Sequence, residues 1–175
     1  MLATKKRNIA VQIPAVAVSV GLMILLPFLI HLIPPVGGVP MGARLLPLFF
    51  IPFVAIVYFH PAVAFFAALV TPFLNQALTG SPPPAMAALL TLELVIFSGA
   101  AYLMFRRRPS FWGIAPLAYI AAIFLATFVA PFLPLLPDQP FIWSALGASL
   151  LTAWPGLLLL LLLNIAIVRN MNHDR

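Results

Sequence analysis

Charged residues are scarce in this sequence, and cysteine is absent. Only 7% of the 175 residues are charged, and three residues are Asp or Glu. The lack of cysteine excludes disulfides, thiol catalysis and cysteine metal sites. The three histidines, His31, His60 and His173, are too far apart in the expected topology to form a metal cluster. We therefore predict no metal site and no cofactor.

Catalytic motifs are missing as well. The sequence contains no phosphate-binding loop and no paired carboxylates, so we expect that the chain does not hydrolyse ATP itself. The segment Gly147-Ala148-Ser149 begins like the motif of an intramembrane serine protease, but Leu150 follows it and no histidine matches it. We therefore predict that the protein is not an enzyme.

Apolar residues dominate what is present. They make up 64% of the chain, and the mean hydropathy is +1.16, far from the composition of a soluble domain. Because a helix needs about 20 apolar residues to cross a bilayer, this length leaves no room for a soluble second domain. Apolar runs predict spans at residues 9–33, 44–60, 62–79, 85–105, 111–133 and 142–168. We expect a single all-α membrane domain, a bundle of six transmembrane helices.

The break at His60-Pro61 decides the number of spans. Residues 44–79 are also long enough to form one kinked helix, since the two halves are short. With five spans, the basic clusters at residues 5–7 and 106–108 would lie on opposite sides of the membrane, against the positive-inside tendency. With six, eight of the nine cationic residues lie inside and only Arg44 lies outside. This predicts cytoplasmic N and C termini and outer loops at residues 34–43, 80–84 and 134–141.

Glu93 is the only acidic residue inside a predicted span. It lies about nine residues from the outer end of the fourth span, and therefore roughly 13 Å deep. A carboxyl group at this depth is neutral, paired or exposed to a hydrated cavity, because an ionised one in hydrocarbon costs at least a few kcal/mol. We interpret Glu93 as a functional group, with a structural hydrogen bond between helices as the alternative.

Other polar or kinked positions lie in the later spans and at the outer face. Asn75 and Arg44, near the outer ends of two spans, either line a cavity or anchor the helix at the interface. Asn164 is expected to form an interhelical hydrogen bond. In the Pro155-Gly156 pair, the proline removes a backbone hydrogen bond, which predicts a kinked or unwound last span. Trp154 is too deep for an interfacial aromatic, so stacking on a ligand is one role open to it.

Small residues at four-residue spacing indicate close helix packing, because lipid provides no hydrophobic force between helices. One stripe lies on the fifth span: Ala118, Ala122, Ala126 and Ala130. We expect it to form a contact within the bundle rather than with another subunit. Two pairs lie in the cytoplasmic half of the first span: Ala15/Ser19 and Ala17/Gly21. These pairs fit internal packing and partner docking equally well.

Several segments follow one another in order and at consistent spacing: residues 36–40 (Val-Gly-Gly-Val-Pro) before 44–47 (Arg-Leu-Leu-Pro), Thr71-Pro72, residues 78–84, Leu92-Glu93-Leu94 with Ser98-Gly99, and Trp154-Pro155-Gly156. Together they cover most of the chain. In these segments the chain resembles the substrate-binding membrane subunit, or S component, of energy-coupling factor (ECF) vitamin transporters.

This resemblance implies a six-helix bundle in the plasma membrane of a bacterial cell. Such a bundle captures a water-soluble vitamin or precursor from outside, and a transmembrane coupling protein and two ATPases drive its uptake. Nucleic acid is not an implied partner. Carried onto this chain, the resemblance implies a substrate site at Glu93, Trp154, Asn75, Arg44 and Gly38. The Ala-x-x-x-Ala docking face of the family's first helix is absent, and the pairs Ala15/Ser19 and Ala17/Gly21 take its place.

Two other functions fit the same residues. A noncatalytic scaffold of the cell-wall or rod-shape assembly type needs no pocket, and its Glu93 would pair with another helix. A small proton-coupled carrier would use Glu93 as the coupling group. The substrate itself does not follow from the sequence, because one carboxyl group and one outer arginine fit a cationic, an amphoteric or an anionic ligand.

Overall fold

A computed structural model describes residues 9–132 and 142–173 of the chain. The regular structure of these residues is entirely helical, without a β-strand. Six helical segments are long and apolar enough to cross a membrane: Gln12–His31, Met41–Tyr58, Pro61–Thr79, Pro84–Arg107, Ile114–Phe132 and Leu146–His173. This confirms the predicted all-α fold of a multi-pass membrane protein.

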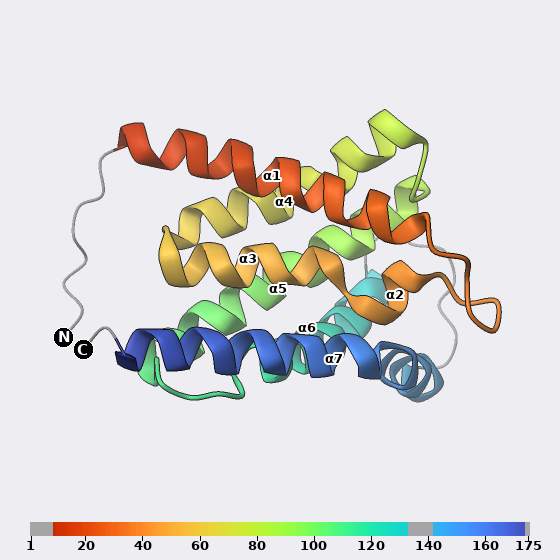
Figure 1. The fold of residues 1–175 in the computed structure, drawn as a ribbon. Coiled ribbons are helices and arrows are strands. Elements are labelled where there is room, and N and C mark those ends of the chain that lie inside the picture. Colours follow the sequence, from red (N-terminus) through yellow and green to blue (C-terminus); the bar gives the residue numbers. More distant parts are fainter. Residues whose placement is uncertain (1–8, 133–141, 174–175) are drawn as a thin grey trace.

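The elements in chain order are α1 (Ile9–His31), α2 (Met41–Leu45), α3 (Pro47–Tyr58), α4 (Pro61–Thr79), α5 (Pro84–Arg107), α6 (Ile114–Val129), the short 3₁₀ helix η1 (Ala130–Phe132) and α7 (Ile142–His173). Successive spans run in opposite directions, so that the start of α1 and the end of α7 lie at the same end of the bundle (Figure 1). The predicted outer loop at 134–141 and the basic residues 5–7 lie outside the described residues.

The break between the second and third spans is where the sequence predicts it. Helix α3 ends at Tyr58 and α4 begins at Pro61. The Nδ1 atom of His60 accepts a hydrogen bond of 3.2 Å from the backbone N–H of Ala62, and so caps the N-terminus of α4. Proline suits the first helical position because its missing N–H would have no partner there.

The second span is broken at a place that was not predicted. It begins at Met41, three residues before the expected start, and Leu46 separates α2 from α3. Leu46 has a φ of 55°, in the left-handed region that residues with a β-carbon seldom adopt. Pro47 then starts α3 in a new direction. The short helix α2 is thereby freed to pack separately from α3.

Helix α7 is continuous through Pro155. In Figure 1 the first turns of α7 are seen nearly end-on, whereas the rest of the helix runs across the view. Proline cannot donate the hydrogen bond to the carbonyl four residues earlier, which permits such a bend. Of the two predicted outcomes, α7 therefore shows a kink and not an unwound turn.

Helix α3 lies at the centre of the bundle, in contact with α1, α4, α5 and α7. Its Phe53 is fully buried. Helix α6 packs between α5 and α7 and buries the whole stripe of Ala118, Ala122, Ala126 and Ala130 inside the chain. The small side chains permit this close approach. The prediction of an internal contact for the stripe is confirmed.

Asn164 of α7 forms the expected interhelical bonds. Its side chain is 1% exposed, and its Oδ1 accepts a hydrogen bond of 2.9 Å from the N–H of Ala115. Its Nδ2 donates to the carbonyl of Phe111 at 3.3 Å. The N-cap residue of α6 is Gly113, which has no side chain to cap the helix. Asn164 therefore caps α6 from a neighbouring helix.

We predict that Asn164→Ala lowers the stability of the protein by about 1 to 2 kcal/mol, because it leaves a buried N–H of α6 without a partner. Thermal unfolding in detergent or nanodiscs measures this loss as a lower midpoint temperature. Asn170→Ala is the matched control, since Asn170 is exposed on the same helix. Equal midpoints for the two variants would contradict the capping role.

Candidate functional site

A cavity of about 690 Å³ lies at the end of the bundle opposite to the start of α1 and the end of α7. Each of the six spans contributes to its lining, which is mostly apolar. The polar side chains that line it are His31, Asn75, Thr79, Ser81, Glu93, Tyr119, Ser149 and Thr152. This volume is within the range of pockets that enclose a small molecule.

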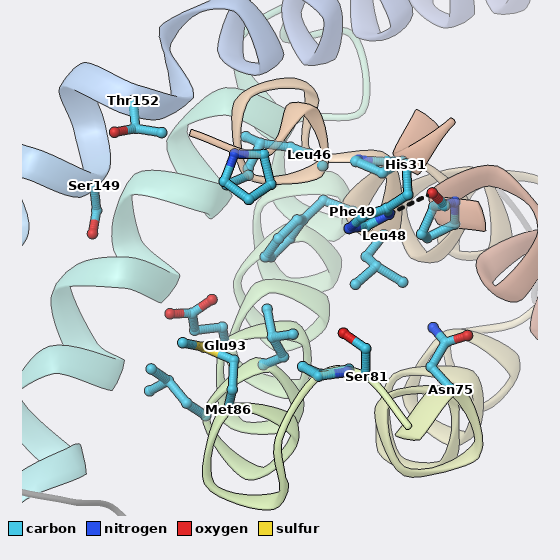
Figure 2. A pocket seen from close by; sticks show the side chains of 18 of the residues that line it. His31, Leu46, Leu48, Phe49, Asn75, Ser81, Met86, Glu93, Ser149 and Thr152 are labelled. Atoms are coloured by element: carbon cyan, nitrogen blue, oxygen red, sulfur yellow. Dashed lines mark hydrogen bonds between the residues drawn. The ribbon is translucent and has the colours of Figure 1, made fainter. Parts of the chain in front are cut away.

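Glu93 lies in the third turn of α5, and its carboxylate points into the cavity beside Phe49 (Figure 2). Among the described residues, this carboxylate forms no hydrogen bond or ion pair, and its electrostatic neighbour is the phenol of Tyr119. The side chain is half-buried. An ionised carboxyl group without a partner in an apolar cavity is costly.

Aromatic rings form a firm wall next to Glu93. Phe49 packs edge to face against Tyr119, with ring centroids 4.9 Å apart, and against Phe97 at 5.2 Å. Phe49 and Tyr119 both line the cavity, yet each is only 3% exposed. Such interlocked rings move little. The cavity is therefore preformed at this position.

A second group of polar side chains lies across the cavity. Figure 2 shows Glu93, Ser149 and Thr152 on one side of Phe49, and three other polar residues on the opposite side: His31, Asn75 and Ser81. His31 forms a hydrogen bond of 2.6 Å from Nδ1 to the carbonyl of Pro27. In the tautomer that forms this bond, Nδ1 donates and Nε2 is an acceptor. Apolar surface separates the two polar groups.

Of the predicted site residues, Glu93 and Asn75 line the cavity together, but Arg44 does not. The Nη2 atom of Arg44 donates a hydrogen bond of 2.8 Å to the carbonyl of Val36. Arg44 therefore lies beside the cavity, next to the lining residues Ala43 and Leu46, and its side chain is not part of the lining. A contact between Arg44 and a substrate stays a prediction.

Gly38 is also outside the cavity lining. Val36 and Val39 exchange backbone hydrogen bonds of 3.2 Å, and Gly37 and Gly38 between them have φ values of 60° and 75°. This is the geometry of a type I′ turn, in which both central residues need positive φ. The positive φ of Gly38 is thus explained by the turn, and its contact with a substrate stays a prediction.

Trp154 is 58% exposed and does not line the cavity. Its neighbour Ala153 is buried, and consecutive helix residues point about 100° apart, which turns the indole toward the surface of the bundle. In a membrane that surface contacts lipid. The structure thus places Trp154 away from the cavity lining, and its stacking on a ligand stays a prediction.

Several residues that line the cavity were not predicted from the sequence. Ser149 and Thr152 are three residues apart on α7 and share one face, so this spacing was a usable signal. Tyr119 follows the first alanine of the buried stripe and Ile123 lies four residues further along, on the same face. His31 was noted only for its place at one end of a span. Its packing against α2 brings it to the cavity: a β-carbon on Gly42 would lie 3.0 Å from its ring.

Helix α2 forms part of the cavity wall and rests directly on α7. A β-carbon at Gly156 would lie 2.6 Å from Cγ of Leu46, 2.7 Å from the carbonyl oxygen of Arg44 and 2.9 Å from the carbonyl carbon of Leu45. No β-carbon fits at such distances from backbone atoms. Gly156 is therefore required for the contact between α2 and α7.

Two kinds of chemical group were sought at this site: a set of metal ligands and a serine beside a histidine. Within residues 9–132 and 142–173 there is no group of three His, Cys, Asp or Glu side chains that could hold a metal ion. Ser149 and His31 share the cavity but lie on opposite sides of Phe49 (Figure 2). Comparison with protein-family models, curated proteins and solved structures finds no match to this chain.

We predict that Gly156→Ala lowers stability by about 1 to 3 kcal/mol, because the added methyl group forces the α2 backbone away from α7. The thermal midpoint in nanodiscs measures this effect. Gly147→Ala on the same helix is the control, since no atom lies within 4 Å of its added methyl group. A Gly156→Ala protein as stable as this control would disprove the close contact.

Proposed function

We propose that the chain is the substrate-capture subunit of an ECF-type importer in the plasma membrane of a bacterial cell. In this role it binds a water-soluble vitamin or precursor from outside. The observation that carries the proposal is the cavity at one end of the bundle, lined by all six spans and containing the unpaired carboxylate of Glu93. The sequence resemblance to S components supports the same assignment.

The distribution of arginine supports an outward-facing cavity. Arg106, Arg107 and Arg108 at the end of α5, and Arg169 near the end of α7, all lie at the end of the bundle away from the cavity. Arg44 alone among the described arginines belongs to the cavity end. Cytoplasmic ends of spans are enriched in Lys and Arg. On this basis the termini are cytoplasmic and the cavity opens to the outside.

The two faces of α1 suggest how partner subunits dock. Ala15 and Ser19 are buried where α1 packs on α3 and α4, whereas Ala17 and Gly21 are exposed. A β-carbon at Gly21 would meet no atom within 4 Å. Small exposed residues at this spacing permit a second helix to approach closely. We assign Ala17 and Gly21 to the face that contacts the transmembrane coupling protein, and Ala15 and Ser19 to internal packing.

The scaffold alternative is less well supported. A scaffold requires no cavity, and it was expected to pair Glu93 with a polar group on another helix. Among the described residues Glu93 has no such partner beyond its electrostatic contact with Tyr119. Transport through partner subunits also agrees with the absence of a phosphate-binding loop in this chain.

We expect the purified protein in nanodiscs to bind one water-soluble vitamin or precursor, with a Kd between about 1 nM and 1 μM. Calorimetry with a vitamin panel measures this affinity. Uptake into liposomes should then require the coupling protein and the ATPases. A protein that binds nothing in the panel contradicts the proposal, and uptake by this chain alone under a pH gradient would instead identify a proton-coupled carrier.

We further predict that Gly21→Leu reduces ATP-driven uptake at least about tenfold, while ligand affinity stays unchanged, because the larger side chain prevents close docking on α1. Co-purification with the coupling protein provides a second measurement. The control is Gly147→Leu, at another glycine where a β-carbon meets nothing within 4 Å. If Gly21→Leu supports uptake at the wild-type rate, this face of α1 is not the docking surface.

A further inference from the structure

The charges around the cavity restrict the class of its ligand, given the capture function proposed above. Five arginines are described, and none lines the cavity. Four of them lie at the opposite end of the bundle, and Arg44 is bonded to the carbonyl of Val36. The segment 133–145 adds Asp138 and no Lys or Arg to the sequence. Glu93 is therefore the one carboxylate among the described lining residues, and no arginine or lysine opposes it.

The presence of one carboxylate without a lysine or arginine in the lining distinguishes between the cationic, amphoteric and anionic ligands that the sequence left open. The carboxylate of Glu93 would repel an anionic group of a ligand. This repulsion would be strong, because apolar walls screen charges much less than water does. An amphoteric ligand needs a cation for its own negative group, and no described lysine or arginine provides one. A positively charged group beside Glu93 supplies the missing partner of the buried carboxylate.

The surroundings of Glu93 also suit a cation. Phe49 and Tyr119 line the same part of the cavity as Glu93. Aromatic rings attract a positive charge, and this attraction adds to that of the carboxylate. The hydroxyl groups of Ser149 and Thr152 lie on the same side of Phe49 as Glu93 (Figure 2) and can accept hydrogen bonds from N–H groups. These groups together form a subsite for a charged nitrogen.

The opposite side of the cavity offers neutral hydrogen-bonding groups. Asn75 and Ser81 can both donate and accept, and His31 retains Nε2 as an acceptor while Nδ1 is bonded to Pro27. We infer that the ligand is a small organic cation whose positively charged nitrogen pairs with Glu93. Its uncharged polar end hydrogen-bonds on the side of His31, Asn75 and Ser81.

The test uses an equimolar mixture of water-soluble vitamins and their precursors, which includes cationic, neutral and anionic compounds. Nanodiscs with wild-type protein are incubated with the mixture, washed, and examined by mass spectrometry for retained compounds. We expect a retained compound that is a cation at pH 7. Glu93→Gln should weaken its binding at least about 30-fold, because the charged nitrogen loses its counter-ion.

Arg106→Gln is the control, since it removes a charge from the far end of the same helix and should leave affinity within about twofold of wild type. Retention of a neutral or anionic compound, or equal binding of the cation by Glu93→Gln, overturns the inference while the capture function stands. Retention of nothing by wild-type protein overturns both. If Glu93→Gln does not fold, the charge of the compound retained by wild-type protein decides the question.

Discussion

The contact between the backbone of α2 and Gly156 of α7 is the constraint on which the cavity end of the molecule depends. Non-helical backbone at membrane depth must be covered by protein, because lipid offers no hydrogen-bond partner. The second span breaks at Leu46, and α7 covers this break where the carbonyl of Arg44 meets Gly156. The break lets α2 lie between α1 and α7 as a wall, while Pro47 directs α3 into the centre of the bundle.

Cationic and acidic side chains of the described spans lie mostly at opposite ends of the bundle. Cationic side chains of the described spans lie at one end, apart from Arg44, and the single carboxylate lies in the cavity at the other. Arg44, at the cavity end, donates a hydrogen bond to the carbonyl of Val36 in the Val36–Val39 turn and does not line the cavity. The cavity thus presents one carboxyl group on a surface that is otherwise mostly apolar and aromatic.

Small residues serve different purposes at different places in the fold, although their spacing is the same. The alanine stripe of α6 is buried between two helices, as is the Ala15/Ser19 pair of α1 against its neighbours. The Ala17/Gly21 pair lies on another face of α1 and is exposed. The same spacing therefore packs the bundle on one face of α1 and leaves small residues exposed on another face.

The sequence alone determined the features that depend on local composition along the chain. The six spans follow from apolar length, and the division at His60-Pro61 follows from the position of basic clusters. Glu93, which lines the cavity, was recognisable as the only carboxyl group within a predicted span. Asn164 was likewise recognisable as an interhelical contact, because a buried amide needs a partner. Each of these signals is carried by one residue or one run of residues.

Only the tertiary structure decided which face of each helix lines the cavity. In a soluble protein the apolar face of a helix points inward, but in a membrane the lipid-facing and core-facing surfaces are both apolar, so hydropathy does not indicate the rotation of a helix. This is why Trp154 was expected inside and lies outside, while Tyr119 and Ser149 were overlooked and line the cavity. The sequence also did not show that Arg44 and Gly38 belong to a turn outside the cavity lining, because the backbone conformation of that turn is not evident from hydropathy or charge.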